Sequence, residues 1–432
     1  MAHQAHNIPW RVLADNFGYR YTSTRAQGQT NLFPKSKNNL DKDLCYFSKA
    51  FCKTLEEHSK IERTKYPDAI RPPDDDEEVF PKLVAYKIKQ AIEYNEEKAP
   101  ENCTTTPLDS RKMRSWVESM WARDPGVDGR ARNYLSYDQI EIIKQLVMHN
   151  EILPALRIVA HPSVELKPAW ERWLNVQIDY GLKAFFYLPL ISYLCLNMLL
   201  QKPEIYDHTV KTRHLQSPLP GMTVVSDTSV LDYRLTRAYQ MTVLYCTNAT
   251  RQSTPHQAFF GISHNGQKQH YNFLDDFVPK CGTMSFFDFK AALEVSQEYP
   301  AHPNDVGEII QILQAKGLPA ELCLGIINCG GFTPSRRSLV VDDPLHTDNA
   351  PELRKYLTYC WQLLIRANVV MESKGLQIDW YQAVVWSIQR LFITPIQVSL
   401  TRCRSSMRDG GLRWLLLDEK LSNGFCTCCY NV

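Results

Sequence analysis

The residues with the most chemical potential in this sequence are histidines and aspartates that share one polar stretch. His264 and His270 lie in it, and Asp275 and Asp276 follow. Paired carboxylates can do acid–base work, and histidine transfers protons near neutral pH. The sequence places no opposing group against these side chains. Polarity of a loop is therefore the favoured interpretation, and no catalytic residue is assigned.

Cysteines are the second set of reactive residues. Cys329 lies beside two glycines and could be a nucleophile on a sharp turn, but a catalytic thiol needs a basic partner that the sequence does not supply. Cys426, Cys428 and Cys429 cluster further on, with Cys403 as the one neighbour that could complete a set of four. Zinc sites usually use two spaced pairs of ligands. No metal ligand and no cofactor is expected.

An acidic run provides a third candidate. Residues 74–78 are five consecutive carboxylates that follow Arg71, Pro72 and Pro73. Consecutive positions on a loop do not converge on one cation, so a solvated loop is favoured. The loop would lead into a helix over 80–96, whose N-terminus suits negative charge. Phosphate-loop, dinucleotide-fold, zinc-protease and serine-hydrolase signatures are absent from the sequence.

Composition indicates a globular protein with little charge imbalance. The 432 residues are 44% hydrophobic, and 49 basic side chains against 47 acidic ones give a net charge of +2. A net charge this small produces little positive electrostatic potential, so it gives no reason to expect nucleic acid as a partner. The first residues lack the basic and apolar blocks of a signal peptide, and the 13 scattered cysteines suit reduced thiols. A cytoplasmic or nuclear location is expected.

The apolar periodicity predicts a mainly α fold with a helical core of several layers. Leu44, Phe47, Phe51 and Leu55 follow one another at steps of three and four, which places them on one helical face. Short strands are expected near 255–275. The predicted organisation is an irregular segment at 1–38, a main helical domain at 39–300, a helical subdomain at 301–392 and a tail at 393–432.

The most apolar stretch runs from Ala184 to Leu200 and has no charge over 17 residues. That length is the lower limit for a membrane span. Pro189, Ser192 and Asn197 interrupt it, and no strong basic cluster flanks one side only. A buried central helix is favoured. Membrane attachment through this stretch, or through the terminal cysteines, is the alternative.

The stretch Leu-Pro-Ala-Glu-Leu-Cys-Leu-Gly-Ile-Ile at 318–327 resembles the first helix of an F-box. That resemblance implies docking to an adaptor of ubiquitin-ligase complexes. The usual continuation into further helices is replaced here by 335–346, which reads Ser-Arg-Arg-Ser-Leu-Val-Val-Asp-Asp-Pro-Leu-His.

A wider resemblance covers about 300–392, and more loosely the chain from about 80. Its segments are the Leu-Pro-x-Glu-Leu of 318–322, the Asp-Asp-Pro-Leu-His of 342–346 and the Tyr-Leu-x-Tyr-Cys-Trp-Gln-Leu-Leu-Ile-Arg of 356–366. These are similar to segments of a family of filamentous-fungal proteins. The resemblance implies no activity, and the residues past Phe392 do not share the pattern.

The function that these observations favour is a non-enzymatic interaction or scaffold protein that docks a protein partner through the subdomain at 301–392. The candidate contact residues are Leu318, Pro319, Leu322, Ile326, Tyr356 and Trp361. The alternative for all six is burial in the core, because apolar side chains at helical spacing are usually buried. An enzyme or accessory factor of fungal secondary metabolism, with a site assembled from distant residues, is a further alternative.

Overall fold

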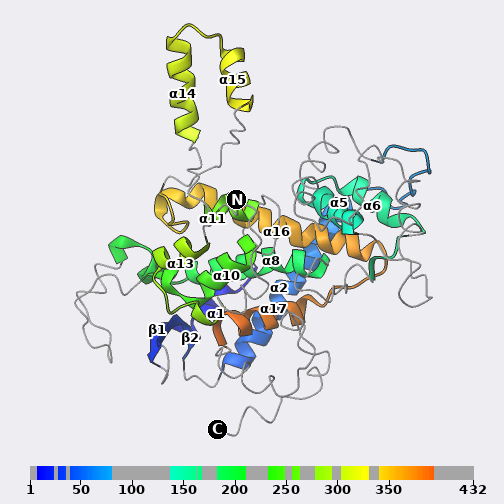
Figure 1. The fold of residues 1–432 in the computed structure, drawn as a ribbon. Helices are drawn as coiled ribbons and strands as arrows, with labels where there is room; N and C mark the ends of the chain where they lie inside the picture. The colour runs from blue at the N-terminus through cyan, green and yellow to red at the C-terminus, as the bar shows by residue number, and fades with distance from the viewer. Residues whose placement is uncertain are drawn as a thin grey trace, which may run out of the picture.

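The structure of the protein is a computed structural model that describes residues 7–23, 28–35, 39–79, 137–162, 164–167, 182–210, 232–248, 255–262, 278–293, 303–329 and 340–393. Within these ranges the fold is mainly α, as the periodicity predicts, and contains one two-stranded sheet (Figure 1).

The elements lie in the following order along the chain. They are α1 (Trp10–Ala14), β1 (Phe17–Ser23), β2 (Gly28–Pro34), α2 (Leu40–Arg63), α5 (Tyr137–Met148), α6 (Ile152–Ala160), α8 (Leu182–Leu200), η1 (Pro203–Ile205), η3 (Tyr233–Leu235), α10 (Arg237–Asn248), α11 (Pro255–Phe260), η4 (Val278–Lys280), α13 (Phe286–Leu293), α14 (Pro303–Ala315), α15 (Ala320–Cys329), η5 (Thr347–Asn349), α16 (Ala350–Glu372), α17 (Trp380–Ile388) and η6 (Gln389–Ile393).

Helix α8 is the centre of the body, which comprises the described elements other than α14 and α15. It packs against α16, α10 and α17, and its apolar side chains are buried. A helix that is apolar on all sides must be covered on all sides, so the expectation of a buried central helix is confirmed. None of the helices in the described ranges has the length and apolar character needed to cross a membrane.

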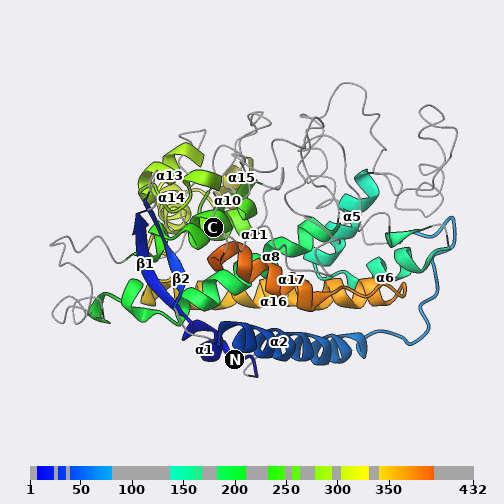
Figure 2. The ribbon, with the colours of Figure 1, turned by 90° about the horizontal axis from the view of Figure 1, so that it is seen from below.

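Helix α16 provides the second core element. Its apolar stripe begins at Leu353 and reaches Met371, and Pro351 lies in its first turn, where a missing N–H costs nothing. Figure 2 shows α16 running alongside α2. Trp361 of α16 packs against Phe51 of α2 and Tyr193 of α8, with ring centroids 5.3 and 5.2 Å apart. Helices α16 and α17 thus share a core with elements before residue 300.

The N-terminal segment differs from the expectation of irregular structure. Residues Phe17–Ser23 and Gly28–Pro34 pair as an antiparallel β-ribbon at one end of the body (Figure 2). Buried Asn31 fixes this ribbon, because its amide nitrogen donates to the carbonyl of Leu391 at 2.8 Å. The expectation of strands near 255–275 is wrong for its described part, since Pro255–Phe260 is helix α11.

Helices α14 and α15 form a hairpin that stands away from the body (Figure 1). We call Pro303–Cys329 the α14–α15 hairpin. Gly317 ends α14 with a φ of 86°, a conformation that favours glycine. The amide of Leu318 donates to the carbonyl of Leu313 at 3.2 Å, which closes the helix end before Pro319 leads into α15. A turn of this kind lets two short helices run antiparallel.

Candidate functional site

Exposed apolar side chains concentrate on and beside the α14–α15 hairpin. Among the residues that the structure describes, eleven large hydrophobic side chains are exposed, and five of them lie between α13 and the residue before Asp342. They are Phe287, Ile312, Leu322, Ile326 and Val341. Because exposed apolar groups that form one patch mark interaction sites, this part of the chain is the candidate site.

Among the hairpin side chains that the structure describes, Cys323 alone is fully buried. Leu322 and Ile312 are each 58% exposed and Ile326 is 48% exposed, whereas Cys323 is buried between the helices. Isolated helices of this length are marginal in water, and packing of an apolar face provides most of their stability. A bound partner that covered Leu322 and Ile326 would supply that packing.

An ion pair joins the chain that precedes the hairpin to the chain that follows it. Lys290 lies on α13, before the hairpin, and Asp342 lies after it. The Lys290 ammonium is 2.7 and 2.9 Å from the two carboxylate oxygens of Asp342. Both side chains are largely buried. The pair therefore closes the excursion of chain between residues 290 and 342, and we call α13 together with 340–349 the neck.

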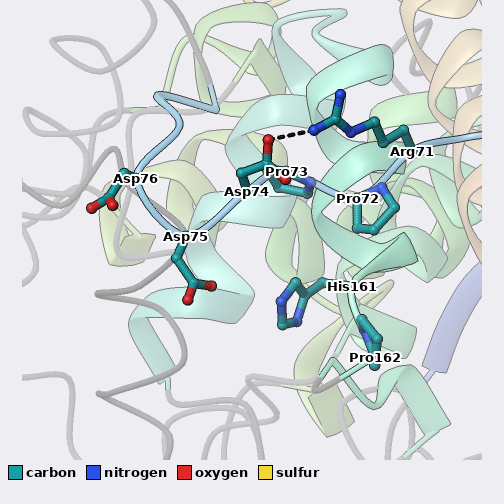
Figure 3. A pocket seen from close by; sticks show the side chains of 8 residues that line it. All are labelled: Arg71, Pro72, Pro73, Asp74, Asp75, Asp76, His161 and Pro162. Atoms are coloured by element: carbon teal, nitrogen blue, oxygen red, sulfur yellow. Dashed lines mark hydrogen bonds and ion pairs between the residues drawn. The ribbon is translucent and has the colours of Figure 1, made fainter.

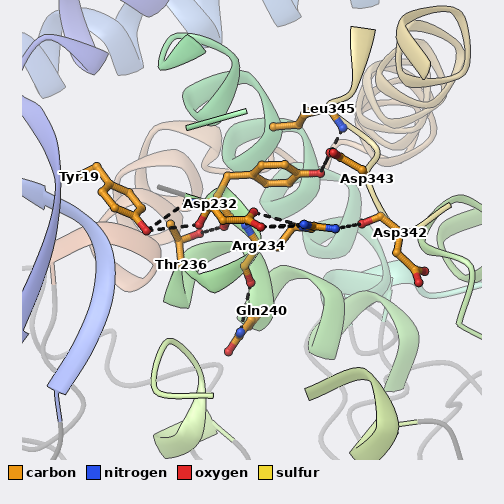
Figure 4. A network of polar contacts seen from close by, with 9 residues as sticks. Tyr19, Asp232, Arg234, Thr236, Gln240, Asp342, Asp343 and Leu345 are labelled. Atoms are coloured by element: carbon orange, nitrogen blue, oxygen red, sulfur yellow. Dashed lines mark hydrogen bonds and ion pairs between the residues drawn. The ribbon is translucent and has the colours of Figure 1, made fainter. Parts of the chain in front are cut away.

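Arg234 joins the neck to the rest of the body (Figure 4). Its guanidinium donates to the carboxylate of Asp232, with the shortest contact at 2.7 Å, and to the carbonyl of Asp342 at 3.2 Å. Burial alone would lower the pKa of Arg234, but the hydrogen bonds and charge of Asp232 outweigh it, so the pKa is raised. Gln240 extends the network by donating to the carbonyl of Arg234 at 3.1 Å. The guanidinium is thus held as a permanent cation.

The segment Asp-Asp-Pro-Leu-His of 342–346 is the other half of this network. The hydroxyl of Tyr233 donates to the Asp343 carboxylate at 2.6 Å and accepts from the amide of Leu345 at 3.2 Å. Asn349 donates to the carbonyls of Val340 and Asp343, each at 2.7 Å. Burial raises the pKa of Tyr233 well above its usual value, so the hydroxyl keeps its proton. The segment 342–346 and its partners Tyr233, Arg234 and Lys290 therefore hold the neck in place, and we call these contacts the clamp.

A surface hollow lies over the acidic loop (Figure 3). Its lining includes Arg71, Asp74, Asp75, Asp76 and His161, and Asp74 pairs with Arg71. The side chains of Asp75 and Asp76 point in different directions in Figure 3. Across the described ranges, no three side chains of the metal-binding types come together as ligands. The hollow carries no assignment of ligand.

One carboxylate of the acidic loop is tied to the body. The guanidinium of Arg157, on α6, donates to both oxygens of Glu77 at 2.6 and 2.7 Å. This bidentate hydrogen bond lowers the pKa of Glu77 to about 2. A depressed folded-state pKa means that the pair stabilises the fold above the ordinary value of 4.5, and that this stabilisation is lost as the pH falls toward 2.

We expect the Glu77 carboxyl to titrate near pH 2 in the wild-type chain and close to its ordinary value of 4.5 in Arg157→Met. Carbon-detected NMR of the side-chain carboxyl measures both values. Arg63→Met is the matched control, because Arg63 donates to the carbonyls of Tyr66 and Asp68. An unchanged Glu77 pKa in Arg157→Met would contradict the prediction.

A second buried network crosses the core between α8, α10, α11 and α16. The hydroxyl of Tyr356 donates to Ser192 at 3.1 Å, and His256 Nδ1 lies 2.6 Å from that hydroxyl. No group in the described part of the chain forms a hydrogen bond with His256 Nε2. Burial lowers the pKa of His256 to about 3, so the ring is neutral. The network is sealed in the core.

The predicted contact residues divide into two groups. Pro319, Leu322 and Ile326 are exposed on the hairpin, and Leu318 is half-buried there. Tyr356 and Trp361 are 5% and 1% exposed. These two residues face α11 and α2 inside the body, so their assignment as contact residues is corrected to core.

Other predicted positions lie elsewhere. Cys329 ends α15. The remaining reactive candidates fall outside the described residues: His264, His270, Asp275, Asp276, Cys403, Cys426, Cys428 and Cys429. The residues that sequence reasoning missed are the partners of the clamp, Arg234, Tyr233 and Lys290. The Asp-Asp-Pro-Leu-His segment was the one available signal, because two adjacent aspartates that become half-buried need partners.

Comparison with known families gives one match. A family model described as "Gramillins biosynthetic cluster protein GRA5" matches residues 11–401. No curated protein matches the chain. No solved structure matches it either.

Proposed function

Since this chain belongs to the family of the gramillins biosynthetic cluster protein GRA5, a fungal family of secondary-metabolite clusters, we propose that it is a non-catalytic accessory protein of such a cluster. It acts by docking a protein partner through the α14–α15 hairpin. The observation that carries the proposal is the exposure of Ile312, Leu322 and Ile326 on a hairpin that stands away from the body. The F-box resemblance of 318–327 points to the same element.

The neck supports the proposal in a second way. A docking element gains affinity when it is held in one orientation before binding, because less freedom is lost on association. The Lys290–Asp342 pair joins the chain before the hairpin to the chain after it, and Arg234 ties Asp342 to residues outside the neck. Holding the two chain directions together in this way restricts the positions that the hairpin can take.

The test is Leu322→Glu combined with Ile326→Glu in the producing fungus. Because both side chains are exposed, we expect the double variant to keep its fold and abundance. Burying two carboxylates in an interface costs far more than exposing them, so metabolite output of the cluster should fall more than about ten-fold. Mass spectrometry of the culture measures the output, and thermal unfolding of purified protein checks the fold.

Ile61→Glu with Tyr46→Glu is the matched control. These residues are 63% and 58% exposed on α2, away from the hairpin, so output should stay at the wild-type level. Full output from the hairpin variant at normal abundance would refute the docking role.

A further inference from the structure

We infer that the partner presents a basic amphipathic helix to the α14–α15 hairpin, an inference that rests on the proposed function. Two antiparallel helices leave a groove between them, and a third helix that fills it completes a three-helix bundle. Leu322 and Ile326 are four residues apart on α15, so they form one ridge. Ile312 adds an exposed apolar group from α14. The occupant must therefore bring a complementary apolar stripe.

The charge of the hairpin indicates which residues should lie beside the apolar stripe of the partner helix. Residues 303–329 contain Asp305, Glu308 and Glu321 against Lys316, a formal net charge of −2. Glu308 is exposed and precedes exposed Ile312 by four residues, so a carboxylate and an apolar group share one face of α14. Lysine or arginine beside the apolar stripe of the partner would meet these carboxylates.

The same charge disfavours a second copy of the hairpin as the occupant. A symmetric dimer would bring together two hairpins that each have a net charge of −2, so their charges would repel.

The test measures binding of two synthetic peptides to the full chain by fluorescence anisotropy. Both are amphipathic helices of about 21 residues, three heptads, with the same leucine stripe. One has lysine beside the stripe and the other has glutamate. We expect the lysine peptide to bind at least about ten-fold more tightly. Raising the salt concentration from about 50 to about 300 mM should reduce the difference in affinity between the two peptides, because exposed charges are screened.

Variants locate the binding. Leu322→Glu with Ile326→Glu should abolish binding of the lysine peptide, whereas Ile61→Glu should leave it unchanged. Glu308→Gln with Glu321→Gln should remove most of the preference for lysine over glutamate, since it removes two of the three carboxylates. Each variant is first compared with the wild type by thermal unfolding.

Four results would overturn the inference. One is equal affinity for both peptides. Another is binding that survives in the Leu322→Glu/Ile326→Glu variant. A third is a dimer of the full chain that this variant dissolves, which would make a second copy the occupant. The last is binding that appears only after residues 402–432 are removed. That segment begins with Arg402, Arg404, Arg408 and Arg413, and the result would make it the occupant. Loss of cluster output in the fungal experiment would show that the hairpin surface is needed whatever helix binds it, so the inference can fail while the role of the hairpin stands.

Discussion

Trp361→Ala is expected to lower the free energy of unfolding by about 3–5 kcal/mol, the usual cost of removing a large aromatic side chain from a core. Trp361 is 1% exposed, and its ring packs against Phe51 and Tyr193. It therefore connects α16 to both α2 and α8. No small adjustment of one helix can fill the space, because three helices enclose it.

Urea denaturation followed by far-ultraviolet circular dichroism measures the effect. Trp361→Phe separates packing from hydrogen bonding, because it keeps a ring and loses only part of the volume and the 2.9 Å bond from the indole nitrogen to His58 Nδ1. We expect it to cost about 1–2 kcal/mol. Tyr46→Ala, on the exposed face of α2, should change stability by less than about 0.5 kcal/mol. A Trp361→Ala variant as stable as Tyr46→Ala would contradict the packing described for α16.

Arg234→Met is expected to lower the free energy of unfolding by about 2–3 kcal/mol, because removing one partner leaves a largely buried charge without compensation. The carboxylate of Asp232 would lose its guanidinium contacts, and the carbonyl of Asp342 would lose its donor. Since Asp342 belongs to the neck, amide hydrogen exchange should also quicken over 342–349.

Arg71→Met is the matched control for that prediction. Arg71 and Asp74 form an ion pair whose side chains are 73% and 70% exposed, so its loss should cost about 0.5 kcal/mol or less. Urea denaturation gives the stabilities, and hydrogen exchange with mass spectrometry gives the local rates. Unchanged exchange over 342–349 in Arg234→Met would show that the network does not hold the neck.

Much of the helical body could be predicted from spacing alone. Apolar residues at steps of three and four identify the buried faces of α2 and α16, and the uncharged run at 184–200 identifies α8 as a central helix. These are local patterns, because each helix closes its backbone hydrogen bonds within itself. The pattern of each helix also reports directly which face is apolar.

The β-ribbon could not be predicted in the same way. Its position depends on Asn31, which bonds to Leu391, and on Thr30, whose amide donates to the carbonyl of Gly282 at 2.8 Å. These partners lie hundreds of residues away in the chain. Short strands take much of their stability from such neighbours, so local composition identifies them poorly.

The candidate site shows the same limit more sharply. Periodicity marks Leu322 and Trp361 equally as apolar-face residues, yet one is exposed and the other is buried. The difference depends on which other helix covers the face, and that is a property of the tertiary fold. The Lys290–Asp342 pair joins residues that are 52 apart in sequence, and local spacing cannot predict a contact between residues so far apart.

The closed neck has a consequence for how this family can diversify. The chain enters and leaves the excursion at one ion pair, and α14 and α15 make few contacts with the other elements that the structure describes. The entropy of closing a loop rises only slowly with its length. Insertions, deletions or replacements between residues 290 and 342 would therefore lower the stability of the body little. The sequence of this segment can change while that of the core is conserved.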